Sequence, residues 1–230
     1  MTALHATRPF DIVGFDLDGT LLDTSATITR AVNATLAQAG RPPLHVDAVK
    51  AIIGGGAKNM LQRGLEVSGG YDPDEMKRLY PFLLDYYGRN MVEGTVPYPG
   101  LLEALDRLAA GGVRLAIVTN KFESFALTLL DALGLRARFA AVIGGDTMGK
   151  GNAKPSAVPI HEMIARAGGG SAVFVGDSPY DTLAARNAGI PSIGVSFGFH
   201  HGPLDELGAD AVIDSYAELL PALERLSGGC

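Results

Sequence analysis

Several short, nearly continuous apolar runs recur along the chain, and each ends at a polar residue or a glycine. Runs of this length without polar alternation are typical of strands buried on both faces, as in a parallel sheet. They cover residues 11–16, 114–120, 140–146, 171–177, 191–196 and 211–214. This pattern constrains the fold more than any other feature of the sequence.

Helical patterns lie between these runs and end at glycines. They cover residues 100–110, 122–133, 155–167 and 180–188. Pro155 is predicted at a first helical position, where a proline costs no hydrogen bond. Alternation of strand and helix predicts an α/β protein with an open, doubly wound (Rossmann-like) parallel sheet.

The alternation fails in one long region that contains helical patterns only. These cover residues 25–39, 46–53, 57–67 and 73–88, and a proline-rich linker follows at 96–100. We predict a small helical cap inserted at 24–94, over an α/β core formed by 1–23 and 95–230. The alternative is that these helices pack on the core like any others.

The composition is typical of a folded globular protein. Its 230 residues are 47% hydrophobic and 19% charged, which permits a substantial buried core. The net charge of −6 offers no basic face for nucleic acid. Cys230 is the only cysteine, so no internal disulfide can form. With no signal-like or membrane-length apolar segment, we predict a cytoplasmic protein that binds neither nucleic acid nor membrane.

Polar side chains stand where several apolar runs end. Carboxyl ends of parallel strands meet at one edge of a sheet, and ligands bind there. Each residue alone has an ordinary explanation, such as a helix cap or a turn, but together they predict one site. The candidates are Asp16, Asp18, Thr119, Asn120, Lys154, Asp177 and Asp181.

The residue types at this edge suit phosphate chemistry. Clustered carboxylates repel each other unless a cation binds them, and hard oxygen ligands favour Mg²⁺. The few histidines and terminal cysteine provide no zinc site. A carboxylate can be the nucleophile, a second can transfer protons, and a lysine and hydroxyl can hold phosphoryl oxygens.

The motifs that carry these residues resemble those of the haloacid-dehalogenase-like superfamily, in order and over nearly the whole chain. They are Asp16-Leu-Asp-Gly-Thr-Leu21, Val118-Thr-Asn-Lys121, Lys154-Pro155 and Val175-Gly-Asp-Ser-Pro-Tyr-Asp181. The resemblance implies a magnesium-dependent phosphatase with an aspartyl-phosphate intermediate. Asp16 would be nucleophile and metal ligand, and Asp18 the general acid/base, with its carbonyl on the metal. Asp177 would bind the metal and Asp181 would support it. Thr119 and Lys154 would bind phosphate, and Asn120 is predicted as a further substrate or phosphate contact.

Within this superfamily the chain is most similar to the phosphoglycolate phosphatases, which implies 2-phosphoglycolate as substrate. The similar segments are residues 53–58, 85–88, 118–121, 142–146 and 174–202. One departure is Tyr180, where these enzymes often carry asparagine. The other is sparse positive charge in the cap, which leaves the carboxylate-binding group open.

Three features have more than one interpretation. The glycines before Lys58 either separate two helices or, together with Lys58, contact the distal end of the substrate. Lys121 is either a phosphate contact or a surface lysine. His200 and His201 are interpreted as loop residues.

Other functions fit part of the pattern. A phosphatase of another small sugar phosphate, or a phosphosugar mutase, would use the same aspartates. A phospho-accepting receiver domain also groups acids around a phosphorylated aspartate, but the insert and the Asp-x-Asp-Gly-Thr spacing argue against it. A non-catalytic interaction protein has no use for these acids. The expected partner is a small phosphorylated metabolite, and the protein is expected to be a monomer or a homodimer.

Overall fold

A six-stranded sheet forms the centre of the computed structural model, which describes residues 9–200 and 202–228. All neighbouring strands pair in parallel, in the order β5-β4-β1-β6-β7-β8. The strands are β1 (Ile12–Phe15), β4 (Arg114–Val118), β5 (Phe139–Ile143), β6 (Ala172–Gly176), β7 (Ser192–Val195) and β8 (Ala211–Ile213). The predicted doubly wound α/β class is confirmed.

The first strand in the sequence, β1, lies near the middle of the sheet. After β1, strands β4 and β5 are added on one side of it, and strands β6, β7 and β8 are then added on the other side. Val13 is paired with Leu115 of β4 and with Val173 of β6. The carboxyl ends of β1, β4 and β6 therefore lie side by side at the point where the winding direction reverses, and such a point is where ligands bind.

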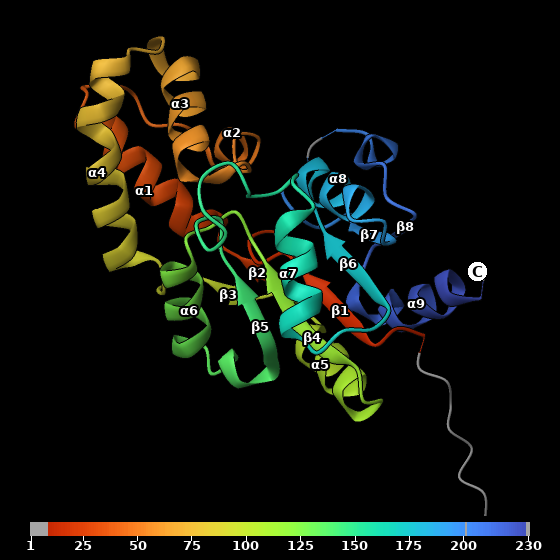
Figure 1. Ribbon diagram of the computed structural model, residues 1–230. Coiled ribbons are helices and arrows are strands. Elements are labelled where there is room, and N and C mark those ends of the chain that lie inside the picture. Colours follow the sequence, from red (N-terminus) through yellow and green to blue (C-terminus); the bar gives the residue numbers. More distant parts are fainter. Residues whose placement is uncertain (1–8, 201, 229–230) are drawn as a thin grey trace, which may run out of the picture.

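Helices cover both faces of this sheet (Figure 1). Successive side chains of a strand point to opposite faces, so β1 contributes to two apolar clusters. Val13 and Phe15 belong to one cluster, and Ile12 packs with Met163 in the other. The first cluster includes residues of α5 (Leu101–Ala110), α6 (Glu123–Ala132) and α9 (Leu219–Ser227). The second includes residues of α7 (Val158–Arg166) and α8 (Pro179–Asn187).

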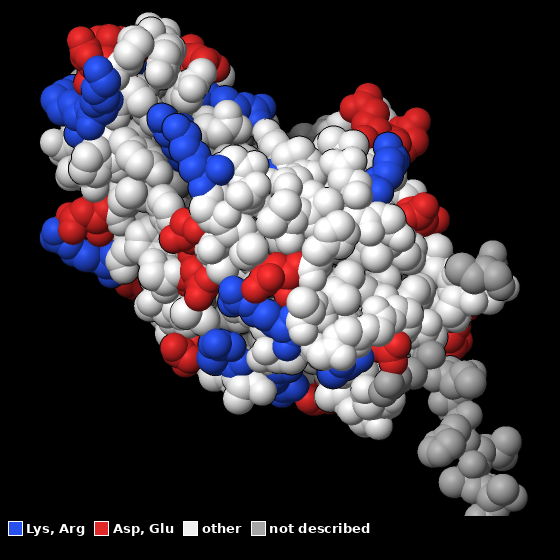
Figure 2. Space-filling model, viewed as in Figure 1, with Lys and Arg blue, Asp and Glu red and all other residues white. Residues whose placement is uncertain are grey.

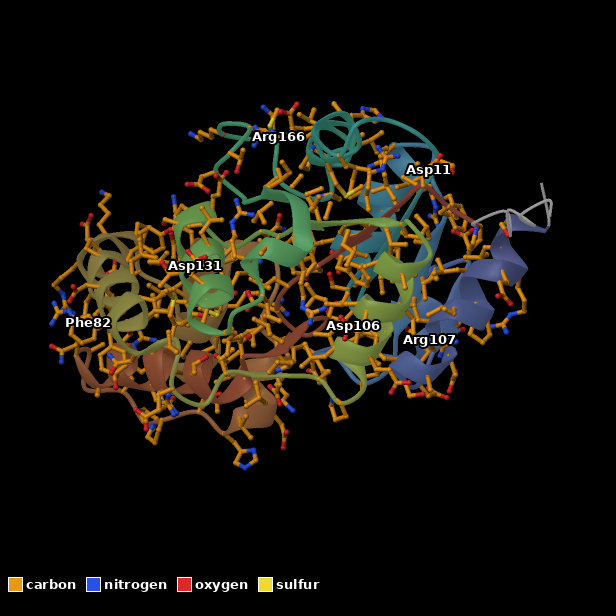
Figure 3. All side chains as sticks on the ribbon, turned by 90° about the horizontal axis from the view of Figure 1, so that it is seen from below. Asp11, Phe82, Asp106, Arg107, Asp131 and Arg166 are labelled. Carbon is orange, nitrogen blue, oxygen red and sulfur yellow. The ribbon has the colours of Figure 1, made fainter. Side chains whose placement is uncertain are left out.

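Four further helices form a lobe beyond one edge of the sheet (Figure 1). They are α1 (Ser25–Ala37), α2 (Val46–Lys50), α3 (Gly56–Gly69) and α4 (Pro73–Asn90). These helices pack most closely on one another, and Leu36, Leu61 and Leu79 are buried between them. Figure 3 shows the same lobe from below, at the end of the molecule opposite α9.

The two chain segments that join this lobe to the sheet pair with each other. β2 (Leu22–Asp23) and β3 (Val96–Pro97) form an antiparallel ribbon, with Leu22 opposite Pro97 and Asp23 opposite Val96. The backbone N–H of Tyr98 donates to the carbonyl of Leu21 at 3.1 Å and extends the contact. The sequence predicts a linker here but not this pairing.

Some predicted elements differ from the structure. The helix predicted at 155–167 begins at Val158, because Ser156 N–H donates to Ala153 in a turn and Asn187 Nδ2 donates to the carbonyl of Pro155. The helix predicted at 46–53 ends at Lys50, before a run of glycines. Helix α9 is absent from the prediction. Three short 3-10 helices cover Arg136–Arg138, Leu204–Leu207 and Tyr216–Glu218.

Charged side chains of both signs are interspersed on the face shown in Figure 2, in small groups. Several form surface ion pairs within one helix, such as Arg89 with Asp85 and Arg166 with Glu162. Within residues 9–200 and 202–228, none of the helices is both long and apolar enough to cross a membrane. Cys230 and His201 lie outside the described residues.

Candidate active site

Three aspartates meet at the carboxyl ends of β1 and β6. Asp16 follows β1, Asp177 follows β6, and Asp181 lies in the first turn of α8. Each offers a carboxylate oxygen, these oxygens lie within 4.8 Å of one another, and all three residues are buried. The structure therefore brings together the three carboxylates that the sequence predicts at this edge.

Burial disfavours the ionised form of these carboxylates. It raises the pKa of Asp16 to about 6, although the nearby Lys154 opposes the shift. Burial also raises the pKa of Asp177 well above its usual range, with further contributions from Asp181 and Asp16. A divalent cation would offset this repulsion, and a donor set made only of oxygens suits Mg²⁺. The residues present thus fit the predicted metal.

Lys154 joins two of these carboxylates. Its Nζ lies 2.8 Å from Asp16 Oδ1 and 2.6 Å from Asp181 Oδ1. Burial favours the neutral amine, but the two carboxylates raise the pKa of Lys154 above its usual value. Oδ2 of Asp181 accepts hydrogen bonds from the N–H and hydroxyl of Ser178, at 2.9 and 2.6 Å. Both oxygens of Asp181 are thus engaged. Apart from its ion pair with Lys154, the buried Oδ1 of Asp16 has no hydrogen-bond partner among the described residues.

Asp18 is held by two side chains. Thr24 Oγ1 donates to Asp18 Oδ1 at 2.8 Å, and Lys121 Nζ donates to Asp18 Oδ2 at 2.6 Å. The Lys121 side chain is 7% exposed, so its interpretation as a surface lysine is wrong. Burial opposes its charge, yet Asp18 raises the pKa of Lys121 above the usual value. The ammonium group also lies 4.7 Å from the centre of the Tyr87 ring, which belongs to α4.

Asp177 is fixed by a loop after β7. The N–H of Phe199 donates to Asp177 Oδ2 at 2.7 Å, and Thr20 Oγ1 is 3.4 Å from Asp177 Oδ1. A Cβ on Gly198 would lie 2.2 Å from Asp177 Cβ and 2.6 Å from the carbonyl oxygen of Gly19. Only glycine allows this loop to approach the carboxylate so closely.

We expect Gly198→Ala to lower the free energy of unfolding by about 1–3 kcal/mol, the usual range for an overpacked site. It should also raise the magnesium concentration needed for half-maximal activity, because Asp177 is displaced. Chemical denaturation and a magnesium titration measure these effects. Gly111→Ala is the matched control, since its nearest contact would be an ordinary 3.4 Å. Unchanged stability and magnesium dependence in Gly198→Ala would contradict the expectation.

Thr119 and Asn120 follow β4 at the same edge. The N–H of Thr119 donates to the carbonyl of Ile143 at 2.9 Å, which holds the buried Thr119 at the end of the strand. Asn120 Nδ2 donates to the carbonyl of Lys154 at 3.0 Å. Asn120 therefore fixes the loop that carries Lys154.

A cavity of about 420 Å³ lies between this edge and the helical lobe. Its core side includes Asp16, Asp18, Asp177, Thr119, Asn120 and Lys121, and helices α1 to α4 form its other side. Lys58 is exposed and is not among the residues that line the cavity. Of the predicted site residues, Asp16, Asp18, Thr119, Asn120 and Asp177 line the cavity. Lys154 and Asp181 do not line it but are joined to Asp16 through the Lys154 ammonium group, and Lys58 lies apart from the site.

The glycine loop before Lys58 packs on the core. A Cβ on Gly54 would lie 3.2 Å from the Tyr180 ring, and one on Gly56 would lie 3.3 Å from the carbonyl oxygen of Asn120. Positive φ angles at Gly54, Gly55 and Gly56 add a second need for glycine. Tyr180, the departure noted in the sequence, therefore contacts this loop.

Several residues that position the site have no role in the sequence prediction. Ser178 could have been found, because a serine three residues before an aspartate is the signature of a capping box. Thr24 and Phe199 carry no such signal, since their roles depend on the tertiary contacts with Asp18 and Asp177.

Fold and site together define an α/β protein with a buried, cation-suited aspartate cluster at the carboxyl edge of its sheet, under a helical lobe. Residues 13–195 match the family described as haloacid dehalogenase-like hydrolase. The chain belongs to this family, which confirms the predicted superfamily and the predicted class of enzyme, a hydrolase.

Individual relatives cover most of the chain. A protein of Agrobacterium fabrum named phosphoglycolate phosphatase is 43% identical, over 91% of this chain and 90% of its own length. A protein of Caulobacter vibrioides with the same name is 39% identical, over 100% and 97%. The crystal structure of a predicted phosphoglycolate phosphatase from Haemophilus somnus has a TM-score of 0.86 at 29% identity, covering 94% of this chain and 99% of that one.

Proposed function

We propose that this chain is a magnesium-dependent phosphatase that hydrolyses small phosphate monoesters through a phosphorylated Asp16, with 2-phosphoglycolate as its substrate. The observation that carries the proposal is the buried aspartate cluster, of which Asp16 and Asp177 line the cavity. Oδ1 of Asp16 has no hydrogen-bond partner among the described residues beyond its ion pair with Lys154. The names of the relatives from Agrobacterium fabrum and Caulobacter vibrioides support the choice of substrate.

The reaction has two steps. In the first, the carboxylate of Asp16 attacks phosphorus and the bond to the alcohol oxygen breaks, while Asp18 donates a proton to that oxygen. In the second, Asp18 accepts a proton from a water molecule, and the oxygen of that water attacks phosphorus. The bond between phosphorus and Asp16 breaks, which releases inorganic phosphate and restores the Asp16 carboxylate. Thr119 and Lys154 hold phosphoryl oxygens during both steps, with Asn120 positioning Lys154.

A magnesium ion held by Asp16, Asp177 and the carbonyl of Asp18 would lower the repulsion between the anionic substrate and the carboxylates. Asp181 would act from behind this set, because its two oxygens already bind Lys154 and Ser178.

We also propose that residues 24–94 are a cap over a core formed by 1–23 and 95–230. The ribbon of β2 and β3 would be its hinge. Closure would exclude water and restrict the leaving groups that fit beneath it.

The size of the cavity favours a second candidate. A volume of about 420 Å³ exceeds what a two-carbon ester fills, and pockets of about 300–1,000 Å³ usually hold larger ligands. The second candidate is therefore a phosphatase of a longer sugar phosphate, or a phosphosugar mutase.

A screen of phosphate monoesters with magnesium, ranked by kcat/KM, tests the proposal. The highest value for 2-phosphoglycolate supports it, and the highest value for a longer sugar phosphate supports the second candidate. Isomerised sugar phosphate as product would indicate a mutase. Phosphorylation without multiple turnover would indicate a receiver domain.

Asp18→Asn should lower kcat for 2-phosphoglycolate by about two to four orders of magnitude, the usual scale for loss of a general acid and base. With p-nitrophenyl phosphate the leaving group needs no proton, so the first step should survive while the second stays slow. Stopped-flow absorbance should then show a burst of roughly one p-nitrophenolate per protein. If both the burst and steady-state turnover are lost, the assignment of Asp18 as the general acid and base is contradicted.

A further inference from the structure

The wall of the cavity on the helical lobe carries two cations. Lys50 is the last residue of α2 and Arg63 lies in α3, and both half-buried side chains line the cavity. Arg63 Nη2 donates to the carbonyl of Ala51 at 3.0 Å, the residue directly after Lys50. This hydrogen bond holds the guanidinium group against the helix end that bears Lys50.

Neither cation has an acidic partner. Among residues 9–200 and 202–228, no carboxylate lies within the 4.0 Å of an ion pair from Lys50 or Arg63. Several other cations of the same lobe do form ion pairs, namely Arg41 and Arg78 with Glu75, Lys77 with Asp74, and Arg89 with Asp85. Two half-buried cations on one cavity wall without acidic partners are available to an anion bound in that cavity.

The other lysines near the cavity are committed to the reacting groups. Lys121 Nζ is bound to Asp18 at 2.6 Å, and Lys154 Nζ bridges Asp16 and Asp181. Among the described lining residues, Lys50 and Arg63 are therefore the lysine and arginine side chains still available to an anionic group. They lie on the lobe side, whereas Asp16 lies on the core side.

We propose that Lys50 and Arg63 form a carboxylate-binding subsite, which selects phosphate monoesters that carry a carboxylate at the end remote from phosphorus. This inference rests on the proposed function, because it assumes that the phosphoryl group lies at Asp16. The planar guanidinium group of Arg63 can donate two parallel hydrogen bonds to a carboxylate, and Lys50 adds a point charge. Lys50 and Arg63 are thus candidates for the carboxylate-binding group, which the sequence alone does not identify.

The test compares two esters of equal length, 2-phosphoglycolate and 2-hydroxyethyl phosphate, which lacks the carboxylate. Lys50→Met and Arg63→Gln should each raise KM and lower kcat/KM for 2-phosphoglycolate by about ten-fold or more, the scale of a lost charged hydrogen bond. The values for 2-hydroxyethyl phosphate should change by less than about three-fold. Compared with Arg63→Gln, Arg63→Lys should retain part of the preference for 2-phosphoglycolate over 2-hydroxyethyl phosphate.

Lys58→Met is the matched control, because Lys58 belongs to the same lobe but is exposed and outside the cavity wall. It should leave both esters unchanged. Equal losses on both esters in Lys50→Met and Arg63→Gln, or no loss on either, would overturn the subsite. Thermal unfolding and activity on 2-hydroxyethyl phosphate show whether each variant is folded, and Lys50→Met keeps the hydrogen bond from Arg63 to Ala51.

The same data separate this inference from the proposed substrate. If another carboxylate-bearing ester is hydrolysed best and the variants still reduce the preference for a carboxylate, 2-phosphoglycolate is wrong and the subsite stands. If wild-type protein hydrolyses 2-phosphoglycolate best but the variants do not change its preference over 2-hydroxyethyl phosphate, the subsite is wrong and the proposed function stands.

Discussion

Replacing Asp16 by asparagine is expected to lower kcat by about four to six orders of magnitude, the scale seen when a covalent nucleophile is removed. The amide has nearly the shape of the carboxylate but neither attacks phosphorus nor binds a hard cation well. The fold should survive, because Lys154 keeps its 2.6 Å ion pair with Asp181. Steady-state kinetics and thermal unfolding measure the two parts of this prediction.

Asp131→Asn is a suitable control, because it is the same chemical change at an exposed residue of α6 (labelled in Figure 3) that does not line the cavity. It should retain wild-type activity. Wild-type protein incubated with substrate and quenched in acid should also carry phosphate on Asp16, detectable by mass spectrometry. Near-normal turnover in Asp16→Asn would rule out the mechanism.

Removal of divalent cations should bring activity to background. A Lewis acid contributes several kcal/mol to such a reaction, and each 1.4 kcal/mol is about a factor of ten in rate. The physical reason lies in the cluster itself, because burial raises the pKa of both Asp16 and Asp177 and leaves their negative charges poorly compensated. Activity is measured after exhaustive chelation and then during titration with magnesium.

Magnesium should restore activity, and calcium should inhibit it, because calcium has a larger and looser coordination shell. Calorimetric titration of Asp177→Asn with magnesium gives a readout independent of turnover, and weaker binding is expected there. Full activity in the chelated protein would contradict the assignment of the cluster as a magnesium site.

The part of the fold that depends on local patterns could be predicted from the sequence. The buried strands appear as continuous apolar runs, and each is followed by the polar residue that it positions. Asp16, Thr119 and Asp177 follow β1, β4 and β6, which are neighbours in the sheet. Their convergence follows from the parallel order of the strands, so no long-range information was needed to group them.

The partners of these residues could not be predicted in the same way. Lys121 and Asp18 are 103 positions apart, and only the packed chain shows that one neutralises the other. The choice of Lys58 as a substrate contact followed from a motif in the sequence, whereas the orientation of α3 directs Arg63, rather than Lys58, to the cavity. Which side of a surface helix faces a cavity depends on the packing of the whole lobe.

The ribbon formed by β2 and β3 bears on how such a chain can change over evolution. Because Leu22 lies opposite Pro97, the chain leaves the sheet and returns to it at nearly the same point. A segment of any length, or of another architecture, could occupy that point without altering the register of the six parallel strands. The aspartate cluster of the core and the residues of the helical lobe can therefore diversify separately within one polypeptide.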